Sequence, residues 1–385
     1  MRIFLAGMNN PLLELHKSAG AETQAYGQVE IVSTYGQPQA EYAAIRKSAG
    51  IMDCPQRGVL ELSGKDRHPF LNNLLTQPIW DKQTKKGMAP GAGVYAFLLN
   101  TKGRIVADMN VLERGESTWL EMDGRMVEPI RATLEKYIFS EQVTMVSRAE
   151  DLHEFFLTGP GIVGNSELNA LGSELASMGQ LATRTCELGT IFRDDVCGVP
   201  GFVLICAVGE AGRIWDFFTT EKPSPQPEPA EDLRFRGRAR PVGWAAFNTT
   251  RIEAGRPLFG IDFDETVLPA ETGQLWRAVS FTKGCYLGQE VVARMHARGQ
   301  LARQIVGIRM DEDALPMAGA QVFDDQQNVI GGVTSSTPSP VLSNAAIALG
   351  YVKKAFMAVG TKVNIPAEGA IRKATVMGLP FVPAV

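Results

Sequence analysis

The stretch Lys283–Glu290, which reads KGCYLGQE, is the part of this 385-residue sequence from which its organisation is most readily interpreted. It places one cysteine between two glycines, and helix-forming residues follow from Gln289 to Met295 before Gly299. Glycine permits positive φ or a close approach of the backbone to a ligand. We therefore expect a tight turn that presents Cys285 just before a short helix.

The neighbours of Cys285 favour a reactive thiol. A nearby lysine and the positive end of a helix both stabilise a thiolate, and Lys283 and the expected helix supply them. A cysteine in a glycine-rich turn can equally be a buried structural residue, and that alternative stays open. In the functional interpretation Cys285 and Lys283 are catalytic groups, and the predicted cofactor contacts are Gly284, Tyr286, Gly288, Gln289 and Glu290.

The octapeptide resembles the K-G-C-[FY]-x-G-Q-E signature of the YgfZ family of folate-binding proteins. These are relatives of the glycine-cleavage T protein (aminomethyltransferase), and they help to maintain iron–sulfur enzymes. The wider segment from Arg251–Gly255 to Arg303 resembles the same family. The resemblance implies tetrahydrofolate or a one-carbon derivative as cofactor. It also implies folate and iron–sulfur client or assembly proteins as partners.

The same resemblance implies a three-lobed α+β fold of the aminomethyltransferase type with a central folate pocket. The expected parts are a discontinuous folate-binding domain (1–137 plus 232–299), a ferredoxin-like domain (138–221) and a C-terminal antiparallel β-barrel (300–385). Patterning of the sequence agrees with this division. Residues 222–231 are proline-rich and indicate a linker. After Leu301, short strands that alternate with Gly/Pro turns indicate a small barrel or sandwich. Earlier strands are expected at 59–64, 94–99, 104–112, 119–122, 143–146, 154–158 and 201–206.

Further candidate site residues lie in segments that resemble aminomethyltransferase sequence. Asp108 ends Gly103–Asp108, which resembles the hairpin that carries an acidic residue beside folate in those enzymes; an ordinary surface carboxylate is the equal alternative. Arg251 and Glu253 belong to the segment Arg251–Gly255. Arg294 begins a basic run that suits a folate glutamate tail or, alternatively, a solvated face.

Two positions depart from the aminomethyltransferase pattern. Val203 stands where those enzymes place a pterin-binding glutamate, and Phe247 stands where they place a folate-contacting arginine. Valine cannot accept the two N–H donors of a pterin. These departures argue against aminomethyl transfer, and they require that pterin binding, if retained, uses other groups.

Composition excludes several classes of function. A net charge of −4 offers no bulk attraction to nucleic acid or anionic membrane, and no apolar run reaches the roughly 20 residues of a membrane span. We therefore expect a cytoplasmic protein with no nucleic-acid and no membrane partner. Five scattered cysteines and four histidines argue against disulfides, a metal site or a resident iron–sulfur cluster, so any cluster would belong to a partner.

Three functions remain open at this point. The first is a folate-binding accessory protein that supports iron–sulfur assembly or repair through Cys285. The second is a folate-dependent aminomethyltransferase centred on Asp108, and the third is a scaffold without activity. The G-x-G-x-x-G pattern at residues 159–164 lacks a surrounding parallel βαβ series, so it is interpreted as a turn rather than a nucleotide site.

Overall fold

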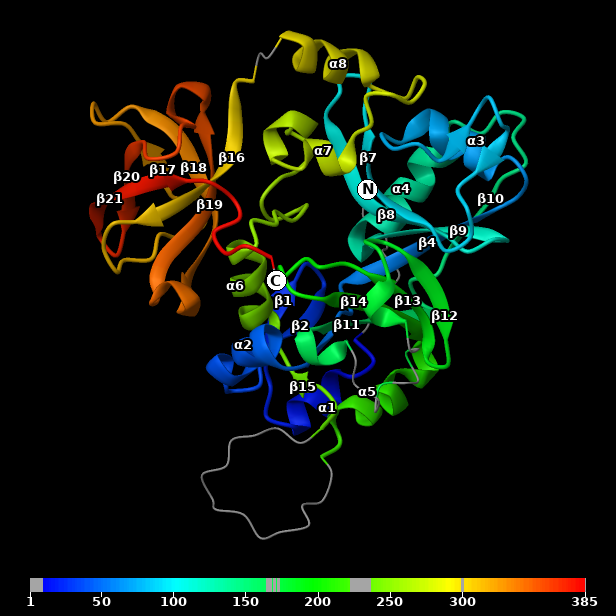
Figure 1. The fold of residues 1–385 in the computed structure, drawn as a ribbon, viewed down its shortest axis with the longest axis horizontal. Coiled ribbons are helices and arrows are strands. Elements are labelled where there is room, and N and C mark those ends of the chain that lie inside the picture. The colour runs from blue at the N-terminus through cyan, green and yellow to red at the C-terminus, as the bar shows by residue number, and fades with distance from the viewer. Residues whose placement is uncertain are drawn as a thin grey trace.

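The computed structural model of the protein describes residues 10–163, 168, 171, 174–221, 237–298 and 301–384. One of its two large sheets is five-stranded and antiparallel (Figure 1). In spatial order its strands are β10 (Thr144–Ser147), β4 (Arg57–Ser63), β9 (Ser117–Asp123), β8 (Ile105–Glu113) and β7 (Gly93–Leu99). Its apolar face packs against α3 (Arg67–Leu74) and α4 (Gly124–Glu135). Because side chains alternate along a strand, its other face is free to line a site.

A six-stranded sheet lies below the first one in Figure 1. Its order is β12 (Thr183–Cys186), β13 (Gly189–Arg193), β14 (Gly201–Ala207), β11 (Leu152–Thr158), β3 (Gly50–Asp53) and β15 (Arg240–Pro241). All pairings are antiparallel except β15 with β3. Phe155, Leu157 and Leu204 face α5 (Ala211–Thr219) in one apolar core. Glu154, Phe156 and Val203 therefore point from the opposite face.

The C-terminal part is a closed barrel, drawn yellow to red in Figure 1. Around the barrel its strands are β16 (Arg303–Met310), β19 (Ala345–Lys353), β18 (Val329–Ser339), β17 (Gln321–Phe323), β20 (Lys362–Ala367) and β21 (Ala370–Met377). Small and β-branched side chains such as Ile308, Ala348 and Val376 fill the interior. Closure removes the free edges that an open sheet of this size would expose.

The remaining elements connect these three parts. α6 packs against α2 and also against β18 of the barrel, so it joins the barrel to the rest of the molecule. The elements are α1 (Leu13–Ser18), β1 (Glu22–Tyr26), β2 (Val29–Thr34), α2 (Pro38–Lys47), β5 (Trp80–Asp81), β6 (Lys86–Gly87), α6 (Trp244–Glu253), α7 (Leu275–Ala278) and α8 (Gln289–Arg298). In the described part of the chain, no helix has both the length and the apolarity that crossing a membrane requires.

The predicted fold class, α+β with a C-terminal antiparallel barrel, is confirmed. The sheets do not follow the expected boundary at residue 138, however. Strand β10 lies beyond that boundary but pairs with β4, and β3 lies before it but pairs with β11. These pairings join residues roughly 80 to 100 positions apart, so local sequence patterns do not reveal them. The predicted linker at 222–231 lies outside the described residues, and Gly159 begins a turn into a short 3₁₀ helix (Pro160–Ile162).

Candidate functional site: a pocket between the two sheets

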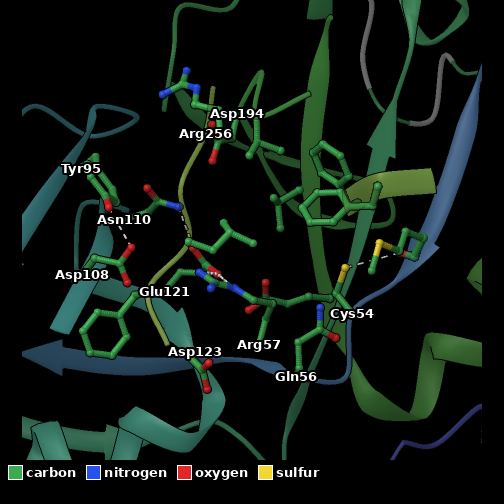
Figure 2. Close-up of a pocket in the computed structure, with 18 of the residues that line it drawn as sticks. Cys54, Gln56, Arg57, Tyr95, Asp108, Asn110, Glu121, Asp123, Asp194 and Arg256 are labelled. Atoms are coloured by element: carbon green, nitrogen blue, oxygen red, sulfur yellow. Dashed lines mark hydrogen bonds and ion pairs between the residues drawn. The ribbon is translucent and has the colours of Figure 1, made fainter. Parts of the chain in front are cut away.

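A pocket lies between the free faces of the two large sheets (Figure 2). The five-stranded sheet contributes a polar wall from β4, β7, β8 and β9, and the six-stranded sheet contributes a wall from β3, β11 and β14. Helix α6, the segment 256–259 and α7 add further lining residues, as do Tyr26, Cys54, Gln56, Asp194 and Val196. The residues of the polar wall are Arg57, Tyr95, Asp108, Asn110, Glu121 and Asp123.

Strand register explains why so many polar groups meet there. Asn110 is opposite Tyr95 on one neighbouring strand and Glu121 on the other, and Asp108 lies two residues along from Asn110. The Tyr95 hydroxyl donates to Asp108 at 2.7 Å, and the Asn110 amide donates to Glu121 at 2.7 Å. Arg57 forms an ion pair with Glu121. The wall therefore consists of two bonded groups, Tyr95 with Asp108 and Asn110 with Glu121 and Arg57.

Two carboxyl groups of the pocket are held toward their neutral form. Burial raises the pKa of Asp108. Burial, together with the nearby Glu121 carboxylate, raises the pKa of Glu154 well above its usual value. Perturbed carboxyl groups of this kind concentrate at functional sites.

The opposite wall is apolar and aromatic. Phe247 packs edge-on against Phe156 with ring centroids 5.7 Å apart, and it contacts Trp244 with centroids 5.4 Å apart. Met52 and Val203 continue this surface. An aromatic wall that faces a polar wall suits a flat heterocycle whose edges carry hydrogen-bonding groups.

Several buried acceptor atoms of the pocket have no hydrogen-bond partner within the protein. They are Gln56 Oε1, Asn110 Oδ1 and both carboxyl oxygens of Glu154. Buried acceptors normally find donors, so these four atoms call for a molecule that brings N–H or O–H groups. Arg256 and Arg277 also line the pocket and supply positive charge. The pocket therefore fits a donor-rich ring that carries an anionic tail.

Comparison with known proteins agrees with this architecture. Residues 12–283 match the GCVT N-terminal domain, and residues 303–383 match the glycine cleavage T-protein C-terminal barrel domain. This chain belongs to the glycine cleavage T-protein family. It is 26% identical over 385 residues to an aminomethyltransferase of Geobacillus kaustophilus, with 96% of this chain and 97% of the relative covered.

Other relatives match over the same length. An aminomethyltransferase of Desulforamulus reducens is 28% identical over 382 residues, with 96% of this chain and 97% of that protein covered. The fold also matches the crystal structure of the glycine cleavage system aminomethyltransferase T of Bartonella henselae. That match has a TM-score of 0.83 and 24% identity, and it covers 98% of each chain.

Within this family fold, three positions singled out from the sequence line the pocket. They are Asp108 on the polar wall, and Val203 and Phe247 on the apolar wall. Five further lining residues were not predicted from the sequence: Arg57, Asn110, Glu121, Asp123 and Glu154. A signal was present, because Asp108 and Asn110 of β8, and likewise Glu121 and Asp123 of β9, are polar residues two positions apart with an apolar residue between them, and a glutamate precedes the apolar run of β11.

The Lys283–Glu290 stretch lies away from this pocket, because none of its residues is among the pocket's lining residues. Lys283 donates to the backbone carbonyls of Asn72, Leu75 and Gln77 at 2.5–3.0 Å. Its side chain therefore fastens the motif to the end of α3. Burial lowers the pKa of Lys283 to about 7, and Lys82 lowers it further. Cys285 is exposed at the surface, and it is not among the residues that line the pocket.

The other motif residues divide into packing and surface groups. Tyr286 is buried in a core cluster, whereas Gly284, Glu290 and Arg294 are exposed and Gln289 is half-buried. Gly288 has φ +79°, and a side chain there would meet the carbonyl of Asn100 in the turn between β7 and β8. The second glycine of the motif is thus needed for close packing on the hairpin that carries Asp108.

Arg251 and Glu253, predicted as cofactor contacts, are fully buried and do not line the pocket. Arg251 pairs with Asp262 and donates to Ser335 of the barrel at 2.7 Å. Glu253 pairs with Arg46 and accepts from Tyr42. These side chains join α6 to the barrel and to α2.

Proposed function

We propose that this protein binds a tetrahydrofolate derivative between its two sheets. We further propose that it acts as an accessory protein in iron–sulfur cluster assembly or repair, as its resemblance to the YgfZ family implies. The observation that carries the folate proposal is the set of unpartnered buried acceptors opposite an aromatic wall. The relatives named above are aminomethyltransferases of the same family, which supports a role in one-carbon metabolism.

The chemistry of a reduced folate complements this pocket at both ends. Its pterin ring carries several N–H donors, which the acceptors Gln56, Asn110 and Glu154 can take. Its glutamate tail carries carboxylates, which the guanidinium groups of Arg256 and Arg277 attract. Asp108 lies on the polar wall with a hydrogen bond from Tyr95, where it can face the one-carbon unit.

The Cys285 thiol has a separate part in the proposal. It is exposed on a loop that Lys283 and Gly288 hold against α3 and the β7–β8 turn. An exposed thiol in a fixed position can meet a partner protein, and Cys285 does not line the pocket between the sheets. We therefore assign it to contact with an iron–sulfur client or assembly protein.

Replacement of Cys285 tests the accessory role. C285S is expected to abolish support of iron–sulfur enzyme activity in cells that lack the wild-type protein, while folate affinity measured by calorimetry stays unchanged. C186S is the matched control, because Cys186 is half-buried and lies far along the chain in β12. Full support of iron–sulfur enzymes by C285S would refute this role.

Folate-dependent aminomethyl transfer is the second candidate, and the position of Asp108 in the pocket favours it. The residues at positions 203 and 247 weigh against it, because valine and phenylalanine line the pocket where the aminomethyltransferase pattern has charged groups. Tetrahydrofolate-dependent release of ammonia from an aminomethyl-lipoyl carrier would establish the transferase, and the accessory role predicts none.

A further inference from the structure

Glu154 occupies a distinctive place on the apolar wall of the pocket. In the pairing of β11 with β14, Phe156 is opposite Val203 and Glu154 is opposite Ile205. Glu154 and Val203 are therefore diagonal neighbours on one face of the sheet, a relation that places side chains within about 8 Å. The carboxyl group of Glu154 thus lies on the strand next to Val203, at the position diagonal to it. Val203 is where the aminomethyltransferase pattern has its glutamate.

Among the described carboxyl groups that line the pocket, Glu154 differs in its bonding. Asp108 accepts from Tyr95, Glu121 is held by Arg57 and Asn110, and Asp123 is held by Tyr26 and Arg125. Asp194 forms an ion pair with Arg277 at 3.3 Å. No N–H group and no hydroxyl group of the protein donates to either oxygen of Glu154, although the residue is only 2% exposed. Its polar neighbour is the Glu121 carboxyl group, which raises its pKa.

We infer that Glu154 anchors the N–H edge of the bound heterocycle, in place of the glutamate that Val203 has replaced. This inference rests on the proposed folate function and names the group that recognises the ring. The two other unpartnered acceptors, Gln56 and Asn110, assist from the same pocket. Phe156 lies on the same face of the sheet as Glu154, and Phe247 packs against Phe156. These two side chains supply the apolar surface for the bound heterocycle.

The fold gives a physical reason for keeping an unpaired carboxyl group there. A buried acceptor without a donor costs about 1–3 kcal/mol. That cost is removed only when a ligand supplies the missing donors, so the group favours the bound state. A carboxyl group in either protonation state still offers an acceptor oxygen to an N–H donor.

The test uses the full-length protein, two substitutions and two fragments of folate. E154Q keeps the shape of the side chain, and E154M replaces it by an apolar group of similar volume. Calorimetry would measure binding of tetrahydrofolate, of a tetrahydropterin without the tail, and of p-aminobenzoylglutamate without the ring. We expect roughly 10-fold weaker pterin binding for E154Q and up to about 100-fold weaker binding for E154M, with p-aminobenzoylglutamate unaffected.

Thermal unfolding of the ligand-free variants separates anchoring from a structural role. Because no N–H or hydroxyl group of the protein satisfies Glu154 and its polar neighbour is the carboxyl group of Glu121, neither substitution should lower the melting temperature, and ligand-induced stabilisation should shrink in both. E150Q, at an exposed glutamate just before β11, is the matched control and should behave as wild type. A variant that melts early would instead indicate a structural role and would refute the inference.

Two outcomes distinguish the anchoring role of Glu154 from the folate-binding proposal on which it rests. Wild-type protein that binds tetrahydrofolate, with E154Q and E154M binding the pterin equally well, refutes the anchoring role and leaves the folate proposal standing. Wild-type protein that binds neither tetrahydrofolate nor the pterin refutes the folate proposal, and the role of Glu154 fails with it.

Discussion

Individual carboxyl groups in the pocket lower the stability of the ligand-free protein, and they accept hydrogen bonds from a ligand once it is bound. Glu154 is buried and Asp108 is half-buried, and the loss of solvation in the pocket raises the pKa of each. Their ionisation in the folded state is therefore opposed. Sites that bind or transform ligands commonly keep such groups at the expense of stability.

D108N should stabilise the ligand-free protein at alkaline pH while weakening folate binding. A carboxyl group whose folded pKa is raised contributes stability that is present at low pH and is lost as pH rises through that pKa. Asparagine cannot ionise, so at pH 8 the free energy of unfolding should rise by up to about 1 kcal/mol. Urea unfolding at pH 5 and pH 8 measures this change. D313N, at an exposed aspartate of the barrel, should show none, and equal pH slopes in D108N and wild type would contradict the prediction.

G288A should destabilise the protein by about 2 kcal/mol or more. Gly288 has φ +79°, which alanine adopts only with strain, and an added Cβ would lie 2.5 Å from the carbonyl oxygen of Asn100. G319A is a useful comparison, because Gly319 also has positive φ (+87°) but has no neighbouring atom within 4 Å of an added Cβ. The difference in urea midpoints between the two variants isolates the packing contribution. Equal midpoints would mean that the motif does not depend on contact with the turn.

Elements are held together in this protein by buried polar groups as well as by apolar packing. Asp53 at the end of β3 accepts from His16 of α1 at 2.9 Å and from His153 of β11 at 2.6 Å. The Tyr35 hydroxyl contacts the other ring nitrogen of His16 at 3.0 Å. This cluster fastens α1 to the six-stranded sheet on the face away from the pocket.

D53N should remove an acid-sensitive part of the stability. Burial by itself raises the pKa of Asp53, but the charges and hydrogen bonds of His153 and His16 outweigh it and lower the pKa to about 2. The stabilisation is therefore present above the ordinary aspartate pKa near 3.8 and is lost as pH falls from about 4 to about 2. It amounts to about 2 kcal/mol. Urea unfolding at pH 6 and pH 3 should show a smaller pH dependence in D53N, with the exposed D325N as control. An unchanged pH dependence would show that this cluster does not set acid stability.

Sequence analysis at the scale of elements succeeded where each element shows its own pattern. The apolar run in 94–99, the turn after it and the returning arm in 104–112 predicted β7 and β8, and the apolar run in 154–158 predicted β11. It missed the hairpin β1–β2 and strand β21. Residues 22–34 do not alternate cleanly between polar and apolar, so they give no strand signal. The strands β1 and β2 pair only with each other, and their burial does not follow a simple two-residue repeat.

At the scale of the whole molecule, α6 is the element on which the arrangement of the barrel depends. Arg251 is fully buried and bonds to Asp262 and Ser335, while Glu253 bonds to Arg46, Tyr42 and Ser339. Buried pairs of this kind contribute little net energy when intact, but loss of one partner leaves an uncompensated charge.

R251M should therefore destabilise the protein by about 3–5 kcal/mol, because the Asp262 carboxylate would stay buried without its cation. Differential scanning calorimetry measures the loss. R309M, at an exposed arginine of the same barrel, should change stability little. A stable R251M protein with weakened folate binding would instead support the cofactor contact that the sequence analysis predicted.

The sequence by itself determined the fold class, the closed C-terminal barrel, most strands near the site, and Asp108 as a pocket residue. The strands follow from local periodicity, whereas the fold class, the choice of a barrel and Asp108 follow from the family resemblance that contiguous motifs carry. The tertiary structure alone decided that β3 and β11 pair across 100 residues, that Glu154 is a neighbour of Val203, and that Cys285 lies outside the pocket. Such relations depend on strand register and on the packing of distant segments, which no local pattern of side chains specifies.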